Sequence, residues 1–256
     1  MGKEWETKIT RVKPNELLIR GYRLDDLIGN ISYASGIYLM LRGDLPSLSE
    51  ERIINSILVA SMDHGVTAPS AVTARTVASS GVPITTAMAA GILAVGDHHG
   101  GAGEKCMRFL QKELKKEEMS NPAELARSVV ERTRKEKIRI PGFGHRFHTN
   151  DPRTTKLLQI AKDAKISGKY VEFAQLIAQE LSDQSGRSLP LNVDGAIGAL
   201  LADMGFVPEL GKAFFAISRI TGLTAHILEE IATQRPMRTI VPGDSVYSGK
   251  SERKIK

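Results

Sequence analysis

Cysteine is nearly absent from this chain of 256 residues, and aromatic side chains make up only 5% of it. The single cysteine, Cys106, cannot form a disulfide within the chain, which excludes a small fold stapled by disulfides. We interpret Cys106 as a packing residue of an apolar helix, with a catalytic thiol as the alternative. The scarcity of aromatics, without an RNA-stacking or zinc-finger pattern, argues against a nucleic-acid partner.

Long apolar runs are also missing. No uninterrupted stretch reaches membrane-spanning length, and residues 1–6 are charged where a signal peptide would need an apolar core. We therefore expect a cytoplasmic protein without membrane contact. Hydrophobic residues at 41% and charged residues at 25% are typical of a folded globular chain, which we expect to form one compact unit with a cleft.

Positive charge is in modest excess, with 35 lysines and arginines against 29 acidic residues and a formal net charge of +6. The basic residues gather at 112–116, 127–139 and 250–256, and in the first two stretches glutamates alternate with them. We interpret most of these residues as solvated helix faces. A small anionic ligand is the functional alternative.

Helical periodicity dominates the rest of the chain. Ser47 and Glu50 have the spacing of a capping box, which predicts a helix start near residue 48. Further helices are predicted by apolar spacing, and the alanine- and glycine-rich one at 85–95 should pack tightly against a partner. The predicted helices are 48–62, 70–79, 85–95, 103–114, 122–135, 152–164, 169–182, 193–204 and 209–232. Strands are indicated only at 7–12 and 17–22, so we expect an all-α fold.

The segment 141–153 is the strongest candidate for a functional site. It places His145 in a turn flexed by Gly142 and Gly144, with Arg153 a short distance beyond. Glycine lets the backbone approach a ligand closely, and a guanidinium binds carboxylates in a two-point geometry. The pattern predicts a proton-transfer group beside an anion clamp.

Two other glycine-containing turns carry histidines. His64 stands where a helix ends before Gly65, and it is either a C-capping residue or a ligand-binding one. His99 lies in the turn at 96–104, where an imidazole can donate to a ligand oxygen. Because His98 and His99 lack the spacing of zinc ligands, we expect no metal there.

Three further charged residues do not reveal a function when each is considered alone. Asp194 begins an apolar helix, where it serves as an N-terminal cap or as a base whose pKa is raised in a pocket. Arg219 lies within a helical run and Arg235 just beyond its end, and each is by itself an ordinary surface residue.

These segments occur in the order and spacing of the citrate synthase superfamily. Residues 20–27 and 38–46 resemble the opening of its large domain, and the resemblance runs from about residue 16 to about residue 242. The other matching motifs are 63–64, 99–101, 142–145, 151–153, 192–194, 218–219 and 235–236. Within the superfamily the chain is most similar to the citryl-CoA lyase module, known also as the C-terminal part of ATP-citrate lyase.

The resemblance implies reversible, metal-free cleavage of (3S)-citryl-CoA to acetyl-CoA and oxaloacetate, a reaction of central carbon metabolism. His145 would take the proton of the citryl hydroxyl, His99 would hydrogen-bond the enolate oxygen, and Asp194 would protonate the acetyl carbon. The implied residues for the oxaloacetate part are His64, Arg153, Arg219 and Arg235. Coenzyme A, as part of substrate and product, would lie on Gly142, Phe143 and Gly144 and near Arg146.

The resemblance also implies the citrate synthase-like fold, with a large and a small helical domain around a cleft. Residues 1–102 and 205–256 would form the large domain, and residues 103–204 the small one that closes over the cleft. The protein would be a homodimer or a higher homo-oligomer, with Arg235 in the neighbouring subunit's site. A citryl-CoA synthetase is a further candidate partner.

Two other functions compete with this one. A citrate or 2-methylcitrate synthase would condense acyl-CoA with oxaloacetate and then hydrolyse the thioester, and His99 favours it. A non-catalytic protein that binds CoA or citrate is a remote alternative, since it would not need His99, His145 and Asp194 together.

Overall fold

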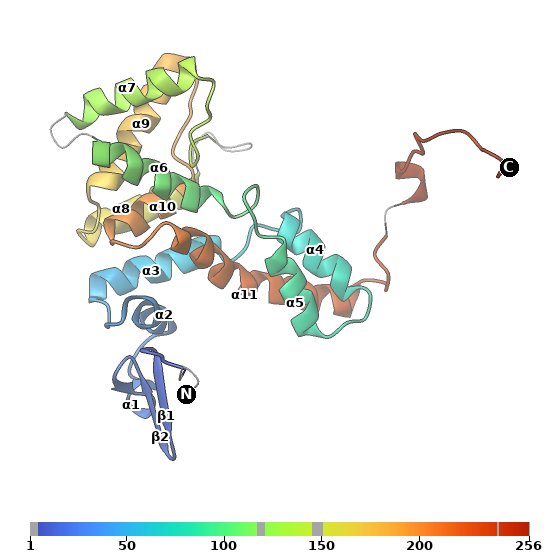
Figure 1. The fold of residues 1–256 in the computed structure, drawn as a ribbon, viewed down its shortest axis with the longest axis horizontal. Coiled ribbons are helices and arrows are strands. Elements are labelled where there is room, and N and C mark those ends of the chain that lie inside the picture. Colours follow the sequence, from blue (N-terminus) through green and yellow to red (C-terminus); the bar gives the residue numbers. More distant parts are fainter. Residues whose placement is uncertain (1–4, 117–120, 145–150, 240, 256) are drawn as a thin grey trace. The chain divides into compact units, whose positions relative to one another are not determined.

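The computed structural model describes residues 5–116, 121–144, 151–239 and 241–255 (Figure 1). Within these residues the chain is mostly helical, which confirms the predicted fold class, and a helix occurs at each of the nine predicted places. No helix among them is long and apolar enough to cross a membrane.

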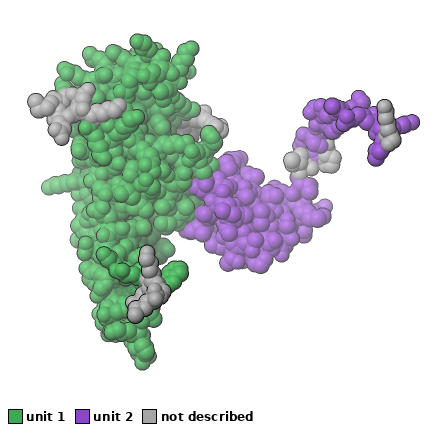
Figure 2. All heavy atoms as spheres, viewed as in Figure 1, with its two compact units in different colours: residues 1–63, 96–219 green, residues 64–95, 220–256 purple. Residues whose placement is uncertain are grey.

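Contacts divide the chain into two compact units (Figure 2). The first unit comprises residues 1–63 and 96–219, and the second comprises residues 64–95 and 220–256. These boundaries differ from the expected large and small domains, and the expected small domain, 103–204, lies wholly within the first unit. The division into a large and a small domain stays a prediction.

A small antiparallel sheet opens the first unit. Strand β1 (Thr10–Lys13) pairs with β2 (Glu16–Ile19), and β2 pairs with the short β3 (Tyr22–Arg23). A turn at Pro14 and Asn15 joins the first two strands, and Asn15 adopts the left-handed φ of 59° that asparagine tolerates. The sheet is followed by the one-turn helix α1 (Leu24–Leu27).

Helix α10 (Val193–Asp203) forms the centre of the helical packing in the first unit (Figure 1). Every residue from Gly195 to Ala202 is buried, and α10 packs on α6, α8 and α9. Burying a side chain such as Leu200 or Leu201 contributes about 1.5–3 kcal/mol. The unit also contains α2 (Tyr33–Arg42), α3 (Leu48–Ser61), α6 (Ala102–Lys116), α7 (Pro122–Lys135), α8 (Pro152–Asp163) and α9 (Lys169–Ser185). The dense packing around α10 fixes its N-terminus, where Asp194 lies.

The second unit is a smaller helical cluster. It contains α4 (Pro69–Ala78), α5 (Ile84–Leu93) and residues 220–233 of α11 (Glu209–Thr233), followed by the short 3-10 helix η1 (Pro242–Asp244). At Gly91 of α5, an added Cβ would lie 2.8 Å from Leu223 Cδ1 and 3.0 Å from Ala74 Cβ. The small residues of this segment therefore allow the tight helix packing that the sequence predicts.

Candidate active site

The backbone of residues 142–144 is bonded to the residues that lead into α10. Asn192 is the centre of this contact: its amide N donates to Gly142 O at 2.9 Å, and its side-chain Nδ2 donates to Gly144 O at 2.9 Å. Its Oδ1 accepts from Gly195 N at 3.0 Å and so caps α10. Gly144 N donates to Pro190 O at 2.8 Å. The loop that precedes His145 is thereby tied to the helix end that carries Asp194.

Two glycines permit this close approach. An ideal Cβ on Gly142, whose φ is +88°, would lie 2.7 Å from Gly195 Cα and 2.9 Å from Cys106 Sγ. A Cβ on Gly195 would collide with Gly142 O and lie 2.6 Å from Leu191 Cδ1. Only hydrogen at both positions fits, so main chain meets main chain at this point.

Asp194 is the second residue of α10 and is half-buried. Because Asn192 is the capping residue, the capping interpretation of Asp194 is wrong in its strict form. A carboxylate in the first helical turn is favoured by the helix dipole. Burial, followed by the nearby charge of Asp194, raises the pKa of Cys106 to about 12. The fully buried Cys106 is therefore a packing residue, as the sequence predicts.

His99 and Arg219 share one aromatic neighbour, Phe215. The His99 ring stands edge-on to Phe215 with 5.4 Å between centroids, and the Arg219 guanidinium lies 4.6 Å from the Phe215 centroid. The chain reverses before His99, with Gly96 and His99 exchanging two backbone hydrogen bonds of 2.8 and 3.1 Å. Phe215 and Arg219 lie four residues apart on α11, a spacing that puts them on the same face of the helix. This spacing is the sequence signal that could have linked Phe215 to Arg219.

Arg219 is only 3% exposed, so it is not the surface residue that it resembles in isolation. Its Nε donates to Ser61 O at 3.0 Å, at the end of α3. Burial lowers the pKa of Arg219, the negative charges of Asp63 and Asp194 oppose this, and the positive charge of Arg153 adds to it. Arg219 therefore lies within electrostatic range of both Asp194 and a second guanidinium.

Arg153 is held by Asp151, a partner that the sequence did not reveal. Its Nε and Nη2 bond to the two carboxylate oxygens of Asp151 at 3.0 and 2.8 Å. Asp151 is 1% exposed and also caps α8 by accepting from Arg153 N at 3.0 Å. The first unit thus brings together His99, Asp194, Arg153 and Arg219, two acid-base candidates beside two cations.

Phe143 and Gly144 line a separate hollow of about 440 Å³ with three arginines. These are Arg134, Arg139 and Arg187. Gly142, predicted with Phe143 and Gly144 as a CoA-binding residue, is buried against Gly195 and does not line this hollow. The hollow is suited to an anionic ligand.

Four predicted site residues lie outside the described part of the first unit. His145 and Arg146 lie outside the described residues. His64 and Arg235 belong to the second unit, where both are exposed and Arg235 lies in the turn after α11. In the described part of the chain, no group of three or more His, Cys, Asp or Glu residues could hold a metal ion.

Comparisons with known proteins agree on one family. The family model for the citrate synthase C-terminal domain matches residues 47–240. Citryl-CoA lyase from Hydrogenobacter thermophilus is 42% identical with a TM-score of 0.92, and the match covers 99% of this chain and 98% of that one. The glyoxysomal citrate synthase of Cucurbita maxima is 32% identical over 233 residues, 86% of this chain and 43% of that protein.

ATP citrate lyase from Methanothrix soehngenii, solved in complex with citrate and coenzyme A, shares the fold at 23% identity and a TM-score of 0.86. The match covers 98% of this chain and 43% of that one. The chain spans about half the length of the curated relatives it matches. With the family model matching most of its length, the chain belongs to the citrate synthase family.

Proposed function

We propose that this protein is a citryl-CoA lyase that cleaves (3S)-citryl-CoA into acetyl-CoA and oxaloacetate. The observation that carries the proposal is the near-complete mutual coverage with the lyase of Hydrogenobacter thermophilus at 42% identity. The curated citrate synthases extend far beyond the matched region, whereas that lyase and this chain cover each other almost entirely.

The charges of the first unit suit the oxaloacetate half of the substrate. Arg153 and Arg219 are close enough for the charge of one to lower the pKa of the other. Two neighbouring guanidinium groups repel each other, so an anion between them is favoured. Each guanidinium can meet a carboxylate with two parallel N–H donors. We assign Arg153 and Arg219 to the carboxylates of this half.

The reaction is a retro-Claisen cleavage in which one base and one acid each move a proton. His145, assigned from the family resemblance, takes the proton of the substrate hydroxyl as the carbon–carbon bond breaks and the oxaloacetate carbonyl forms. The bonding electrons pass into the thioester to give an enolate, whose oxygen accepts a hydrogen bond from His99. Asp194 then gives its proton to the terminal carbon and completes acetyl-CoA.

The positions of His99 and Asp194 support these roles. A preorganised donor to an enolate oxygen contributes about 3–4 kcal/mol to transition-state stabilisation. The T-shaped contact with Phe215 orients the His99 ring, and α10 fixes the backbone of Asp194. No metal is needed in this scheme, because the imidazole carries the electrophilic role.

Coenzyme A is the polyanionic part of the substrate, and we assign its phosphates to the hollow beside Phe143 and Gly144. Arg134, Arg139 and Arg187 supply positive charge there. The hollow includes Phe143 and Gly144, the residues that directly precede His145 in the chain, and this proximity supports the assignment.

Arg235 completes the proposed set from a second copy of the chain. Arg235 is exposed and follows the last turn of α11. Both features suit a residue that reaches into a neighbouring subunit. We propose a homo-oligomer in which each site receives one Arg235 from its neighbour.

A citrate synthase is the second candidate, favoured by His99 and by the curated relative at 32% identity. Product analysis with synthetic citryl-CoA separates the two functions. The lyase yields acetyl-CoA and oxaloacetate without free thiol, whereas hydrolysis yields citrate and one thiol per turnover. Because the single cysteine, Cys106, is fully buried, the native protein adds no thiol background. Release of stoichiometric thiol would overturn the lyase proposal.

A further inference from the structure

The turn that follows α11 is held by a buried carboxylate in the second unit. The Glu230 side chain is 1% exposed, and its Oε1 and Oε2 accept from Arg238 Nε and Nη2 at 2.9 and 2.7 Å. Arg75 Nε donates to Glu230 Oε2 at 2.7 Å, and Arg75 Nη1 donates to Glu229 at 2.7 Å. One carboxylate of α11 thus joins α4 to the segment beyond the helix end.

The backbone of the same turn is fixed at both ends. Gln234 N donates to Glu230 O at 3.0 Å, which continues the helical pattern. Beyond the reversal, where Met237 has a left-handed φ of 58°, Met237 N donates to Ser79 O at 2.8 Å. Arg238 N donates to Ser79 Oγ at 2.9 Å. Arg235 stands between these two anchored ends.

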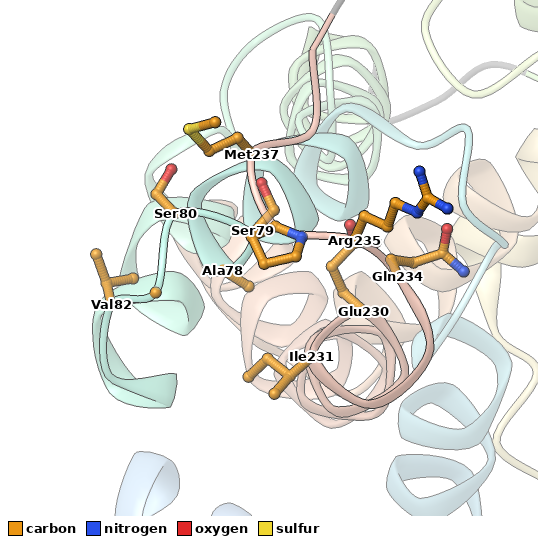
Figure 3. Close-up of a pocket in the computed structure, with 11 residues that line it drawn as sticks. Ala78, Ser79, Ser80, Val82, Glu230, Ile231, Gln234, Arg235 and Met237 are labelled. Carbon is orange, nitrogen blue, oxygen red and sulfur yellow. The ribbon is translucent and has the colours of Figure 1, made fainter.

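Close packing does not hold this turn in place. A hollow of about 340 Å³ lies between residues 78–82 and the turn (Figure 3). Figure 3 shows the Arg235 side chain extending away from Ser80 and Met237. A turn over a hollow keeps one conformation only if polar contacts fix it.

The charges of the cluster are balanced. Arg75 and Arg238 face Glu229 and Glu230, so two positive and two negative groups cancel. Buried ion pairs add little net stability compared with apolar packing, but a fully bonded one defines geometry. The cluster leaves Arg235 as the cation of this turn that is directed outward.

We propose that Glu230, together with Arg75 and Arg238, is a positioning cluster that fixes Arg235 for binding of the substrate carboxylate. This inference rests on the proposed function, in which Arg235 contacts the oxaloacetate part of citryl-CoA. Arg238 is then a positioning residue that touches no substrate and acts through Arg235.

A double-mutant cycle on the full-length protein tests this inference. Arg238→Ala should raise the KM for citryl-CoA about 10-fold with little change in kcat, because misplacing a binding group by about 1 Å is costly. Arg235→Ala should raise KM further, and the double variant should match Arg235→Ala alone. Arg23→Ala is the matched control, since Arg23 forms the same two-point pair with Asp25 in the exposed N-terminal part of the chain.

Hydrogen exchange of the substrate-free protein gives a readout independent of activity. The amides of Met237 and Arg238 should exchange at least about 10-fold faster in Arg238→Ala, and at the unaltered rate in Arg23→Ala. Arg238→Lys keeps the charge but loses the two-point contact, and it replaces the alanine variant if that variant does not fold.

Multiplicative KM effects in the double variant, or a raised KM without faster exchange, would overturn the inference and leave the proposed function intact. Faster exchange with an unchanged KM would do the same. A wild-type protein that does not act on citryl-CoA would instead refute the proposed function, and this inference with it.

Discussion

Asp151 and Arg153 form a two-point ion pair across a single helix start, with N–O distances of 3.0 and 2.8 Å. The carboxylate is buried, whereas the guanidinium side chain is 25% exposed. Asp151 therefore holds one edge of the Arg153 guanidinium and defines its orientation. Asp151 can do this without touching the substrate.

Replacing Asp151 by asparagine should weaken substrate binding. Asparagine can still cap α8, but it loses the charged pair, and hydrogen bonds to charged groups contribute about 1.5–3 kcal/mol. We expect the KM for citryl-CoA to rise about 10-fold, measured by steady-state kinetics. Asp25→Asn, which breaks the exposed pair with Arg23, should leave KM unchanged. Equal KM values for both variants would show that Arg153 does not depend on Asp151.

Asp194→Asn should remove the acid that we propose protonates the acetyl carbon. Acid-base groups contribute about 10²- to 10⁴-fold, so kcat should fall by at least about 10²-fold. The fold should persist, because Asn192 caps α10 and the lost helix-dipole term is only about 0.3–1 kcal/mol. Single-turnover cleavage and a melting curve measure the two effects. A variant as fast as the parent would rule out the assigned role.

Gly195→Ala should destabilise the first unit and reduce activity. The new methyl meets Gly142 O and Leu191 Cδ1, and such overpacking costs about 1–3 kcal/mol. Gly36→Ala in α2 is the control, since its Cβ meets only Ile31 Cδ1 at 3.9 Å and alanine favours a helix by up to about 1 kcal/mol. Denaturant unfolding should therefore move in opposite directions for the two variants.

Arg187→Ala should affect the CoA part of the substrate alone. If Arg187 meets a phosphate in the hollow beside Phe143, the KM for citryl-CoA should rise about 10-fold while kcat stays within about twofold. Arg127→Ala is the control. Arg127 is exposed on α7, forms an ion pair with Glu180 and does not line the hollow. Identical kinetics for both variants would place the phosphates elsewhere.

The stability provided by Glu230 should depend on pH. The Arg238 guanidinium, and to a smaller extent Arg75, hold the pKa of Glu230 below its ordinary value. Such a group stabilises the fold fully above its unfolded pKa of about 4.3, and the contribution is lost as pH falls through the lower folded value. The difference in unfolding free energy between wild type and Glu230→Gln should be constant between roughly pH 6 and pH 7. The same difference should shrink below about pH 4. A difference independent of pH would contradict this.

Local signals in the sequence predicted most of the helices. The capping box at Ser47 and Glu50 is present as predicted, with bonds of 3.3 and 2.8 Å, and it starts α3. The helix α2 was not predicted, because five consecutive apolar residues at 37–41 and the internal Gly36 obscure its period. Strand β3, with two residues, is too short to carry an alternation.

The candidate site was predictable only in part. Histidines in glycine turns pointed to His99, and Asp194 stood out at a helix start. Phe215 and Asp151 were not singled out, because their importance lies in contacts across the fold: Phe215 with His99, and Asp151 as the buried partner of Arg153. Spacing along a chain reveals which residues share a face, but it does not reveal which faces meet.

The close contact between Gly142 and Gly195 has a consequence for redesign of this protein. Because the two segments touch through their main chains, a side chain at either position would collide with the facing segment, so the spacing between the 142–144 loop and α10 requires glycine at both places. Redesign at this point must therefore act through side chains beside the contact, such as Leu191. The two glycines set the spacing between the two segments, and the surrounding side chains are the positions that can be varied.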